Sequence, residues 1–129
     1  MTILGLDLGT KKTGVALSSG VMAEGYATLD SGGESFNDFV AALKQIASEQ
    51  AVDKVIIGLP LGKDSKPTAQ SRWTKAKAQE IGAALHLPVE FVEESYSSAQ
   101  AEGEKGDRDQ NSARIILEQY INETSSRSL

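Results

Sequence analysis

The chain has 129 residues and a net charge of −5, with 40% hydrophobic and only 5% aromatic residues. This length suits one domain with a single core, and the low aromatic content predicts a core of leucine, isoleucine, valine and alanine. No apolar run is long enough to cross a bilayer, and the first residues form no signal-peptide pattern. We therefore expect a cytoplasmic protein without a membrane partner.

The sequence has no cysteine and one histidine, His86. Disulfides, thiolate metal sites and multi-histidine centres within one chain are therefore excluded. Any bound metal must take oxygen ligands, which favours Mg²⁺ or Mn²⁺. The acidic balance argues against broad non-specific binding to nucleic acid, which relies on a basic surface, but it leaves room for a local basic patch.

The first third of the sequence predicts three strands, over residues 2–8, 13–19 and 22–29. Their short connections indicate an antiparallel meander. Apolar residues then recur at helical spacing over about 35–49. Residues 55–59 form a continuous apolar run, which is typical of a strand covered on both faces.

The second half predicts two long helices around a fifth strand. The expected elements are a helix over about 68–85, a strand over 87–92, a short helix over 96–102, a loop over 103–108 and a last helix over 109–123. This order predicts an α/β fold with a mixed five-stranded sheet and helices on its faces. We expect a single domain over 1–123, followed by a flexible tail over 124–129.

Three acidic residues stand at positions where an α/β sheet commonly builds a ligand site. Asp7 closes an otherwise apolar strand, Glu94 follows the fifth strand, and Asp109 opens the last helix. An unpaired buried charge is costly, and ligand sites gather at the carboxyl ends of strands. The three acids together predict an oxygen-only metal site. Each also has a plainer explanation, as a turn cap, a solvated strand end and a helix N-cap respectively.

Basic and hydroxyl side chains near these acids are candidate phosphate contacts. They are Thr10, Lys11 and Lys12 in the first turn, Arg72 and Lys75 one turn apart on the second long helix, and Lys105 and Arg108 before the last helix. A solvated surface is the alternative explanation for the first two groups.

Four blocks of this sequence resemble the YqgF/RuvX family, an RNase H-like group described both as Holliday junction resolvases and as pre-16S rRNA nucleases. The blocks are ILGLDLGTKKTGVA at 3–16, IGLPLG at 57–62, FVEESYSSAQAE at 91–102 and DQNSARIILEQY at 109–120. They occur in the family's order and span nearly the whole chain. Two positions depart from the family pattern, because Glu93 replaces the usual Asp and Ser95 replaces the usual Arg.

The resemblance implies the strand order 3-2-1-4-5 and a catalytic, metal-binding site at Asp7, Glu94 and Asp109. It implies a nuclease that depends on Mg²⁺ or Mn²⁺ and hydrolyses phosphodiester bonds in structured nucleic acid. Processing of pre-16S rRNA ends is the first expectation, and resolution of branched DNA is the alternative. A junction resolvase needs two active sites, so a monomer and a homodimer both stay open.

Two functions of other classes also match parts of the sequence. The block around Asp7 is similar to the first phosphate loop of actin/Hsp70-like ATPases, but those proteins need two such domains and this chain has room for one. A non-catalytic module of the same fold, binding nucleic acid or protein, is the other alternative. Retention of all three acids argues against this second alternative.

Overall fold

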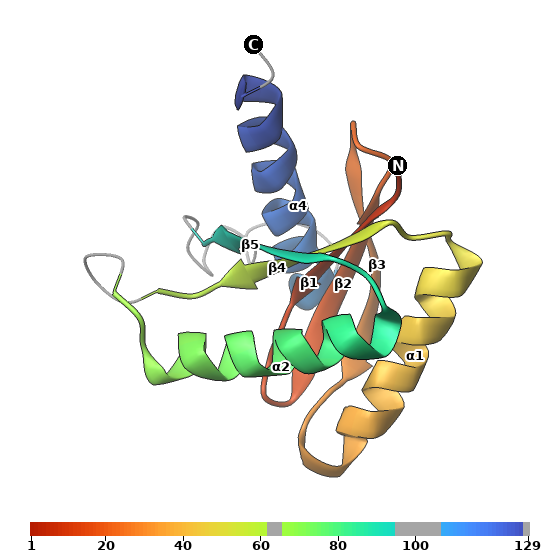
Figure 1. Cartoon of the computed structure of the whole chain (residues 1–129), viewed down its shortest axis with the longest axis vertical. Coiled ribbons are helices and arrows are strands. Elements are labelled where there is room, and N and C mark those ends of the chain that lie inside the picture. Colours follow the sequence, from red (N-terminus) through yellow and green to blue (C-terminus); the bar gives the residue numbers. More distant parts are fainter. Residues whose placement is uncertain (62–65, 95–106, 128–129) are drawn as a thin grey trace.

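A five-stranded mixed sheet forms the centre of the fold (Figure 1). The structure is a computed structural model that describes residues 1–61, 66–94 and 107–127. Strands β1 (Ile3–Asp7), β2 (Lys12–Ser18) and β3 (Ala23–Asp30) form an antiparallel meander. Strands β4 (Lys54–Leu59) and β5 (Val89–Glu93) extend the sheet in parallel with β1. The resulting order, β3-β2-β1-β4-β5, confirms the prediction.

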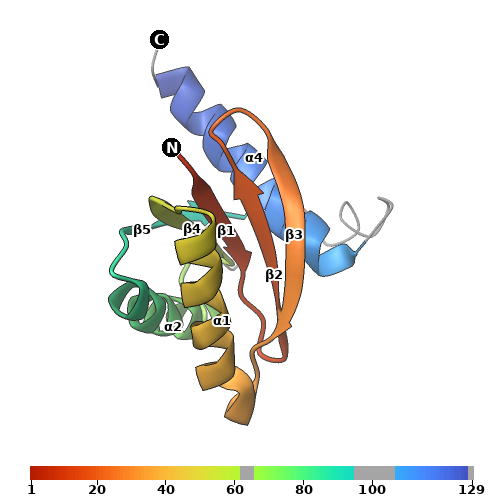
Figure 2. The same ribbon diagram turned by 90° about the vertical axis from the view of Figure 1, so that its right-hand side faces the viewer.

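Helices cover both faces of the sheet, as Figure 2 shows from the side. Helix α1 (Phe36–Glu49), which follows a short 3₁₀ turn (Gly33–Ser35), and helix α2 (Ala69–Leu85) pack on one face. Helix α4 (Arg108–Arg127) packs on the other. Within the described ranges, no helix combines the length and apolar character needed to span a membrane.

The alternation of side chains along β1 divides the core into two parts. Leu4 and Leu6 are fully buried on the side of α1 and α2, whereas Ile3 packs with residues of α4. Successive strand residues point to opposite faces, so Gly5 and Asp7 lie on the same side as Ile3. The end of β1 therefore presents its carboxylate to the face covered by α4.

Glycines in the sheet let α4 approach the strands closely. A Cβ atom on Gly5 would lie 2.3 Å from the Leu117 side chain, and one on Gly14 would lie 1.8 Å from the carbonyl oxygen of Asp109. A third such atom, on Gly58, would lie 2.5 Å from the end of the Ile116 side chain. Larger residues at these positions would force the helix away from the sheet, so the three glycines set its distance.

Polar contacts fix the middle of α4 to β4 and β5. The Lys54 ammonium group donates a hydrogen bond of 3.1 Å to the Tyr120 hydroxyl and pairs with the Glu90 carboxylate. The Tyr120 hydroxyl in turn donates to Glu90 over 3.2 Å. These groups are partly exposed, so their net effect on stability is about 1 kcal/mol at most. They nevertheless connect the helix to both strands.

The predicted boundaries are wrong at both ends of the last helix. Helix α4 begins at Arg108, which was assigned to a loop, and it continues to Arg127. Residues 124–127, predicted to belong to a flexible tail, are therefore helical. The predicted short helix at 96–102 and the first part of the loop, 103–106, lie outside the described residues, as do 128 and 129.

We expect Gly14→Ala to destabilise the protein by about 1–3 kcal/mol, because the added methyl group overlaps helix backbone that cannot rotate away. Equilibrium urea unfolding measures this change. Gly82→Ala on α2 is the matched control, because its new methyl group would approach one side-chain methyl group of Val89 at 2.9 Å but no backbone atom more closely than 3.5 Å, the distance to the Leu87 carbonyl oxygen. An equal loss of stability in both variants would contradict the proposed role of Gly14.

Candidate active site

Asp7 is half-buried at the carboxyl end of β1, where the strand has already paired with β2 on one side and β4 on the other. Its backbone is therefore held in the middle of the sheet and its carboxylate faces α4. A carboxylate in this position loses part of its hydration, and the hydrogen bonds between strands do not compensate its negative charge.

Glu94 reaches the same place from the end of β5. Its backbone N–H donates to the Leu59 carbonyl over 3.2 Å, which continues the parallel pairing by one residue. The preceding carbonyl, of Glu93, accepts a hydrogen bond of 2.6 Å from the Gln119 amide on α4. A Cβ atom on Gly58 would lie 2.8 Å from the Glu94 carboxylate, so this glycine also leaves room for the acid.

Asp109 enters the site from the first turn of α4. The sequence left open whether this residue serves only as an N-cap, and the structure assigns that role to Asp107. The Asp107 carboxylate accepts a hydrogen bond of 3.0 Å from the backbone N–H of Gln110 and one of 2.8 Å from the Thr28 hydroxyl. The Asp109 carboxylate is thereby left to act on Asp7, whose charge it opposes.

The surroundings of Asp7 and Glu94 change the ionisation of these two acids. Burial, followed by the negative charges of Glu94 and Asp109, raises the pKa of Asp7 from 3.8 to about 7, and Arg108 opposes this shift. Burial also raises the pKa of Glu94. The hydrogen bond between the two side chains favours the proton on Asp7 and the charge on Glu94. Two carboxyl groups that share a proton are typical of sites where cations or catalysis require close negative charge.

The predicted three-ligand metal site is not fully assembled in the described part of the chain. Asp7 and Glu94 share a hydrogen bond, whereas no group of three acidic or histidine side chains is close enough there to hold one ion. The donor set itself fits a hard divalent cation, since every candidate ligand is a carboxylate oxygen.

The turn that follows Asp7 is held by buried hydroxyl groups. Thr13 donates to Ser31 over 2.8 Å, and Ser31 donates to the Gly9 carbonyl over 2.9 Å. The Gly9 N–H donates back to the Thr13 hydroxyl over 3.3 Å. This closed set of bonds fixes the turn while Thr10, Lys11 and Lys12 stay exposed. The three predicted phosphate contacts of the first turn therefore stand on a rigid support next to Asp7.

The other predicted contacts are divided between the two faces of the sheet. Arg108 is exposed on the first turn of α4 and lies close enough to Asp7 to affect its pKa. Arg72 and Lys75 are exposed on α2, which covers the opposite face. The structure thus brings Arg108 to the acids but not this pair. Lys105 lies outside the described residues.

Several residues that build this site were missed by the sequence analysis. Asp107 has a signal that sequence reasoning can use, because an Asp followed three residues later by Gln at a helix start is a capping pattern. Thr13 and Ser31 have no such signal. Their bond joins residues that are brought together only by the pairing of β2 with β3.

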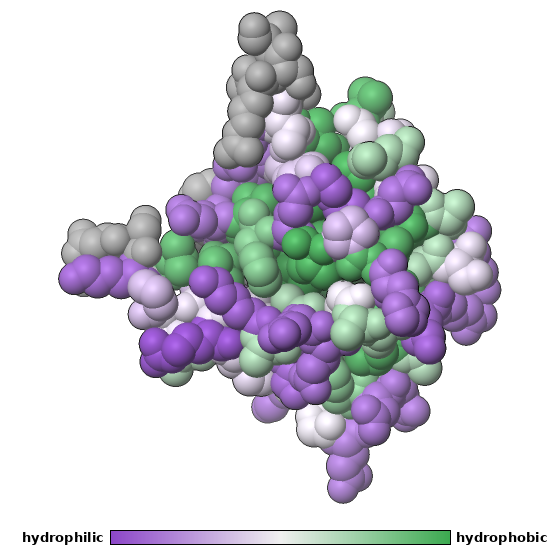
Figure 3. Space-filling view, viewed as in Figure 1, coloured by the Kyte–Doolittle hydropathy of each residue, from purple (hydrophilic) through white to green (hydrophobic). Residues whose placement is uncertain are grey.

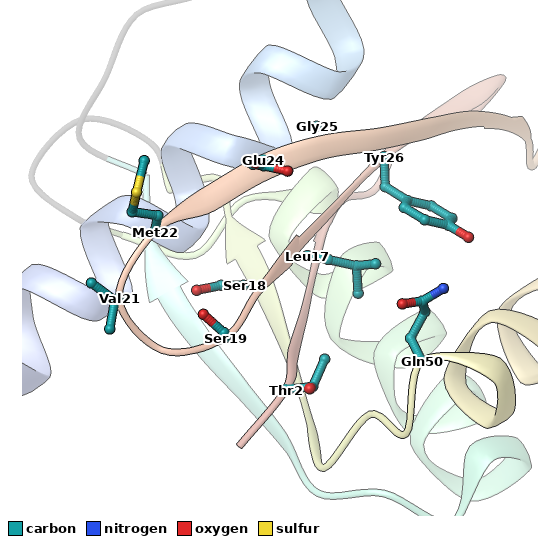
Figure 4. A pocket seen from close by; sticks show the side chains of 10 residues that line it. All are labelled: Thr2, Leu17, Ser18, Ser19, Val21, Met22, Glu24, Gly25, Tyr26 and Gln50. Atoms are coloured by element: carbon teal, nitrogen blue, oxygen red, sulfur yellow. The ribbon is translucent and has the colours of Figure 1, made fainter.

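A hollow on the described surface lies at the other end of β1 from Asp7. It has a volume of about 580 Å³ and lies beside the β2–β3 turn, where Figure 4 shows Thr2, Leu17 and Met22 among its lining side chains. Thr2 precedes β1 and Asp7 ends it, so the length of a strand separates the two places.

Figure 3 shows hydrophobic residues over β4 and β5 and hydrophilic residues over much of α2.

Comparison with known sequences identifies a matching family and its relatives. The family model described as "RuvX: Holliday junction resolvase" matches residues 1–123. A protein of Thermosynechococcus vestitus named "Putative pre-16S rRNA nuclease" is 38% identical, over 97% of this chain and 90% of its own length. A protein of Synechocystis with the same name is 33% identical, over 92% of this chain and 85% of its own length.

Comparison with solved structures identifies the same fold. RuvC of Thermus thermophilus in complex with a Holliday junction substrate superposes with a TM-score of 0.68 at 12% identity, covering 99% of this chain and 96% of its own. A second Thermus thermophilus RuvC structure gives a TM-score of 0.62 at 11% identity, covering 96% and 97% of the two chains. These likenesses establish an RNase H-like fold of the RuvC type.

We expect the free energy of unfolding of the metal-free protein to decrease between about pH 4 and about pH 7. In the folded protein the pKa of Asp7 is about 7, so the side chain keeps its proton up to that pH. In the unfolded chain it releases the proton near the ordinary pKa of 3.8. Asp7→Asn removes this loss and stabilises the protein near pH 8 by at least about 1 kcal/mol. Urea unfolding in the presence of a chelator, at about pH 5 and about pH 8, measures both effects. Asp38→Asn, which changes an exposed acid on α1, should keep the wild-type pH dependence; a parallel profile for Asp7→Asn would contradict the assignment.

Proposed function

Because this chain belongs to the RuvX family of Holliday junction resolvases, we propose that it is a divalent-metal-dependent endonuclease acting on structured nucleic acid. Its first proposed substrate is the ends of pre-16S rRNA, the RNA named for relatives that are 38% and 33% identical. Branched DNA is the second candidate, supported by the description of the family. The proposal includes a cytoplasmic location and nucleic acid as the partner.

The observation that supports a hydrolytic site most directly is the pair formed by Asp7 and Glu94. These two carboxyl groups are brought together by the parallel strands β1, β4 and β5, with Asp109 added from α4. Nothing in the packing of the core requires two acids in contact, and their proximity costs free energy of folding. A bound cation would offset that cost. Cation binding therefore accounts for the two adjacent acids, whereas a purely structural role does not.

Asp7, Glu94 and Asp109 are the residues that would hold Mg²⁺ or Mn²⁺. When bound there, such ions supply a water activated for attack and stabilisation of the charge on the leaving 3′ oxygen. Glu94 and Asp109 would also orient the water by accepting its hydrogen bonds. The one histidine of the sequence, His86, ends α2 in a left-handed conformation and takes no part.

The exposed residues around the acids would hold the phosphate backbone. Lys11 and Lys12 follow Asp7 on the fixed turn, with Thr10 between them and the strand, and Arg108 lies close enough to Asp7 to lower its pKa. Arg72 and Lys75 belong to the opposite face, so we assign them at most contacts with nucleic acid that extends beyond the site. We also retain Lys105 as a proposed contact from the sequence.

A cleavage assay with Mg²⁺ and with Mn²⁺ tests the proposal. A fragment from the end of pre-16S rRNA and a synthetic four-way DNA junction are offered to the wild type, Asp7→Asn and Asp38→Asn. We expect metal-dependent cutting that decreases by about 100-fold or more in Asp7→Asn and is unchanged in Asp38→Asn. The preferred substrate identifies the pathway.

Failure of the wild type to cut either substrate would overturn the nuclease proposal. Binding without cutting, with both variants equally folded, would instead identify a non-catalytic module of the same fold. Sedimentation of the active form then separates the two nuclease functions, because a junction resolvase requires a dimer.

The double variant Lys11→Gln, Lys12→Gln should weaken binding of nucleic acid more at low salt than at high salt. Each phosphate contact that is lost should reduce the slope of log affinity against log salt by roughly 0.7–0.9. Filter binding or fluorescence anisotropy across a salt series measures the slope. Lys44→Gln replaces an exposed lysine on α1 and removes half as much charge as the double variant. A change of slope half as large in this control would contradict a specific role for the first turn.

A further inference from the structure

One row of paired residues crosses the antiparallel part of the sheet beneath the start of α4. Asp7 on β1 pairs with Gly14 on β2, and Gly14 pairs with Thr28 on β3. Residues directly opposite one another in neighbouring strands point to the same face. All three positions therefore face α4, with Asp7 at one end of the row and Thr28 at the other.

The first turn of α4 contacts Thr28 and Gly14 and acts on Asp7 through its charge. The Asp107 carboxylate accepts a hydrogen bond of 2.8 Å from the Thr28 hydroxyl. The backbone of Asp109 lies over Gly14, at 1.8 Å from where a Cβ atom would be, and the charge of Asp109 acts on Asp7. The first turn of α4 therefore crosses the row. Asp107 holds it at Thr28, and Asp109 stands nearer to Asp7.

A single oxygen atom of Asp107 joins the helix end to the sheet. The same Oδ1 atom that accepts the Thr28 hydrogen bond also accepts the Gln110 N–H, at 3.0 Å. The Asp107 carbonyl accepts the next helical bond, from the Asn111 N–H at 2.9 Å. The first turn of a helix frays easily, because its N–H groups have no partners within the helix. Here the cap that stops fraying is also the contact that fixes the turn in space.

We propose that Thr28 and Asp107 are positioning residues for the acidic site, and that their hydrogen bond sets where Asp109 stands relative to Asp7 and Glu94. The inference rests on the proposed metal-dependent function, since it assigns to this bond part of the affinity for the divalent cation. Partners that orient metal ligands typically contribute 10- to 100-fold in metal affinity. Thr28 lies on the edge strand β3, two strands away from Asp7. The positions of the three acids alone therefore do not indicate a positioning role for Thr28.

Binding of Mn²⁺ to the whole chain without substrate, followed by calorimetry, tests the inference directly. We expect Thr28→Val, which keeps the shape of the side chain and removes the hydroxyl, to weaken binding by about tenfold. Thr28→Ser restores the hydroxyl and should bind within about twofold of the wild type. Asp107→Asn keeps an oxygen acceptor for both bonds and should bind better than Asp107→Ala. Amide hydrogen exchange at Gln110 should be faster in Thr28→Val than in Thr28→Ser.

Thr124→Val is the matched control on the same helix. It removes a hydroxyl that donates to the Tyr120 carbonyl over 2.9 Å, far along α4 from the first turn, and it should leave Mn²⁺ binding unchanged. Equal Mn²⁺ affinity in Thr28→Val and the wild type, or equal losses in Thr28→Val and Thr28→Ser, would overturn the inference while leaving the nuclease proposal intact. A wild type that neither binds Mn²⁺ nor cuts nucleic acid would overturn both.

Discussion

The close approach of α4 to the sheet is the constraint on which the rest of this structure depends. Gly5, Gly14 and Gly58 remove the side chains that would hold the helix away, and buried leucine and isoleucine residues of α4 fill the space. Without that approach, the Asp109 carboxylate would stand too far from Asp7 to affect its ionisation. The same packing that completes one half of the core therefore brings together the parts of the acidic site.

The acidic site lowers the stability of the fold. Burial raises the pKa of both Asp7 and Glu94, and the hydrogen bond between them raises the pKa of Asp7 further while lowering that of Glu94. The surrounding structure tolerates this cost because both acids are attached to the ends of well-paired strands, and the turn after Asp7 is closed by buried hydroxyl bonds. Burial and repulsion of this kind are typical of functional sites, where binding of a ligand relieves them.

Much of the fold was predictable from the sequence because its signals are local. The alternation along β1 to β3 and the helical spacing over α1 identify the elements, and the strand order follows from the resemblance carried by four blocks. The partly buried position of Asp7 was predictable, because this acid closes an otherwise apolar strand. The distribution of Arg72 and Lys75 to the opposite face was not, because a helix sequence alone does not tell which side of a sheet the helix covers. The same limit applies to the link between Thr13 and Ser31, which exists only after β2 and β3 have paired.

The position of α4 also has a consequence for the timing of activity during synthesis. Asp7 lies on β1 and Asp109 on α4, so the acidic site joins segments that are far apart in the sequence and are synthesised at different times. Long-range contacts of this kind form late in folding, because closing a long loop of chain costs entropy before the contact stabilises it. The nascent chain therefore lacks a complete site until α4 has emerged and docked. A metal site that requires Asp109 would therefore become complete only after α4 has docked on the sheet.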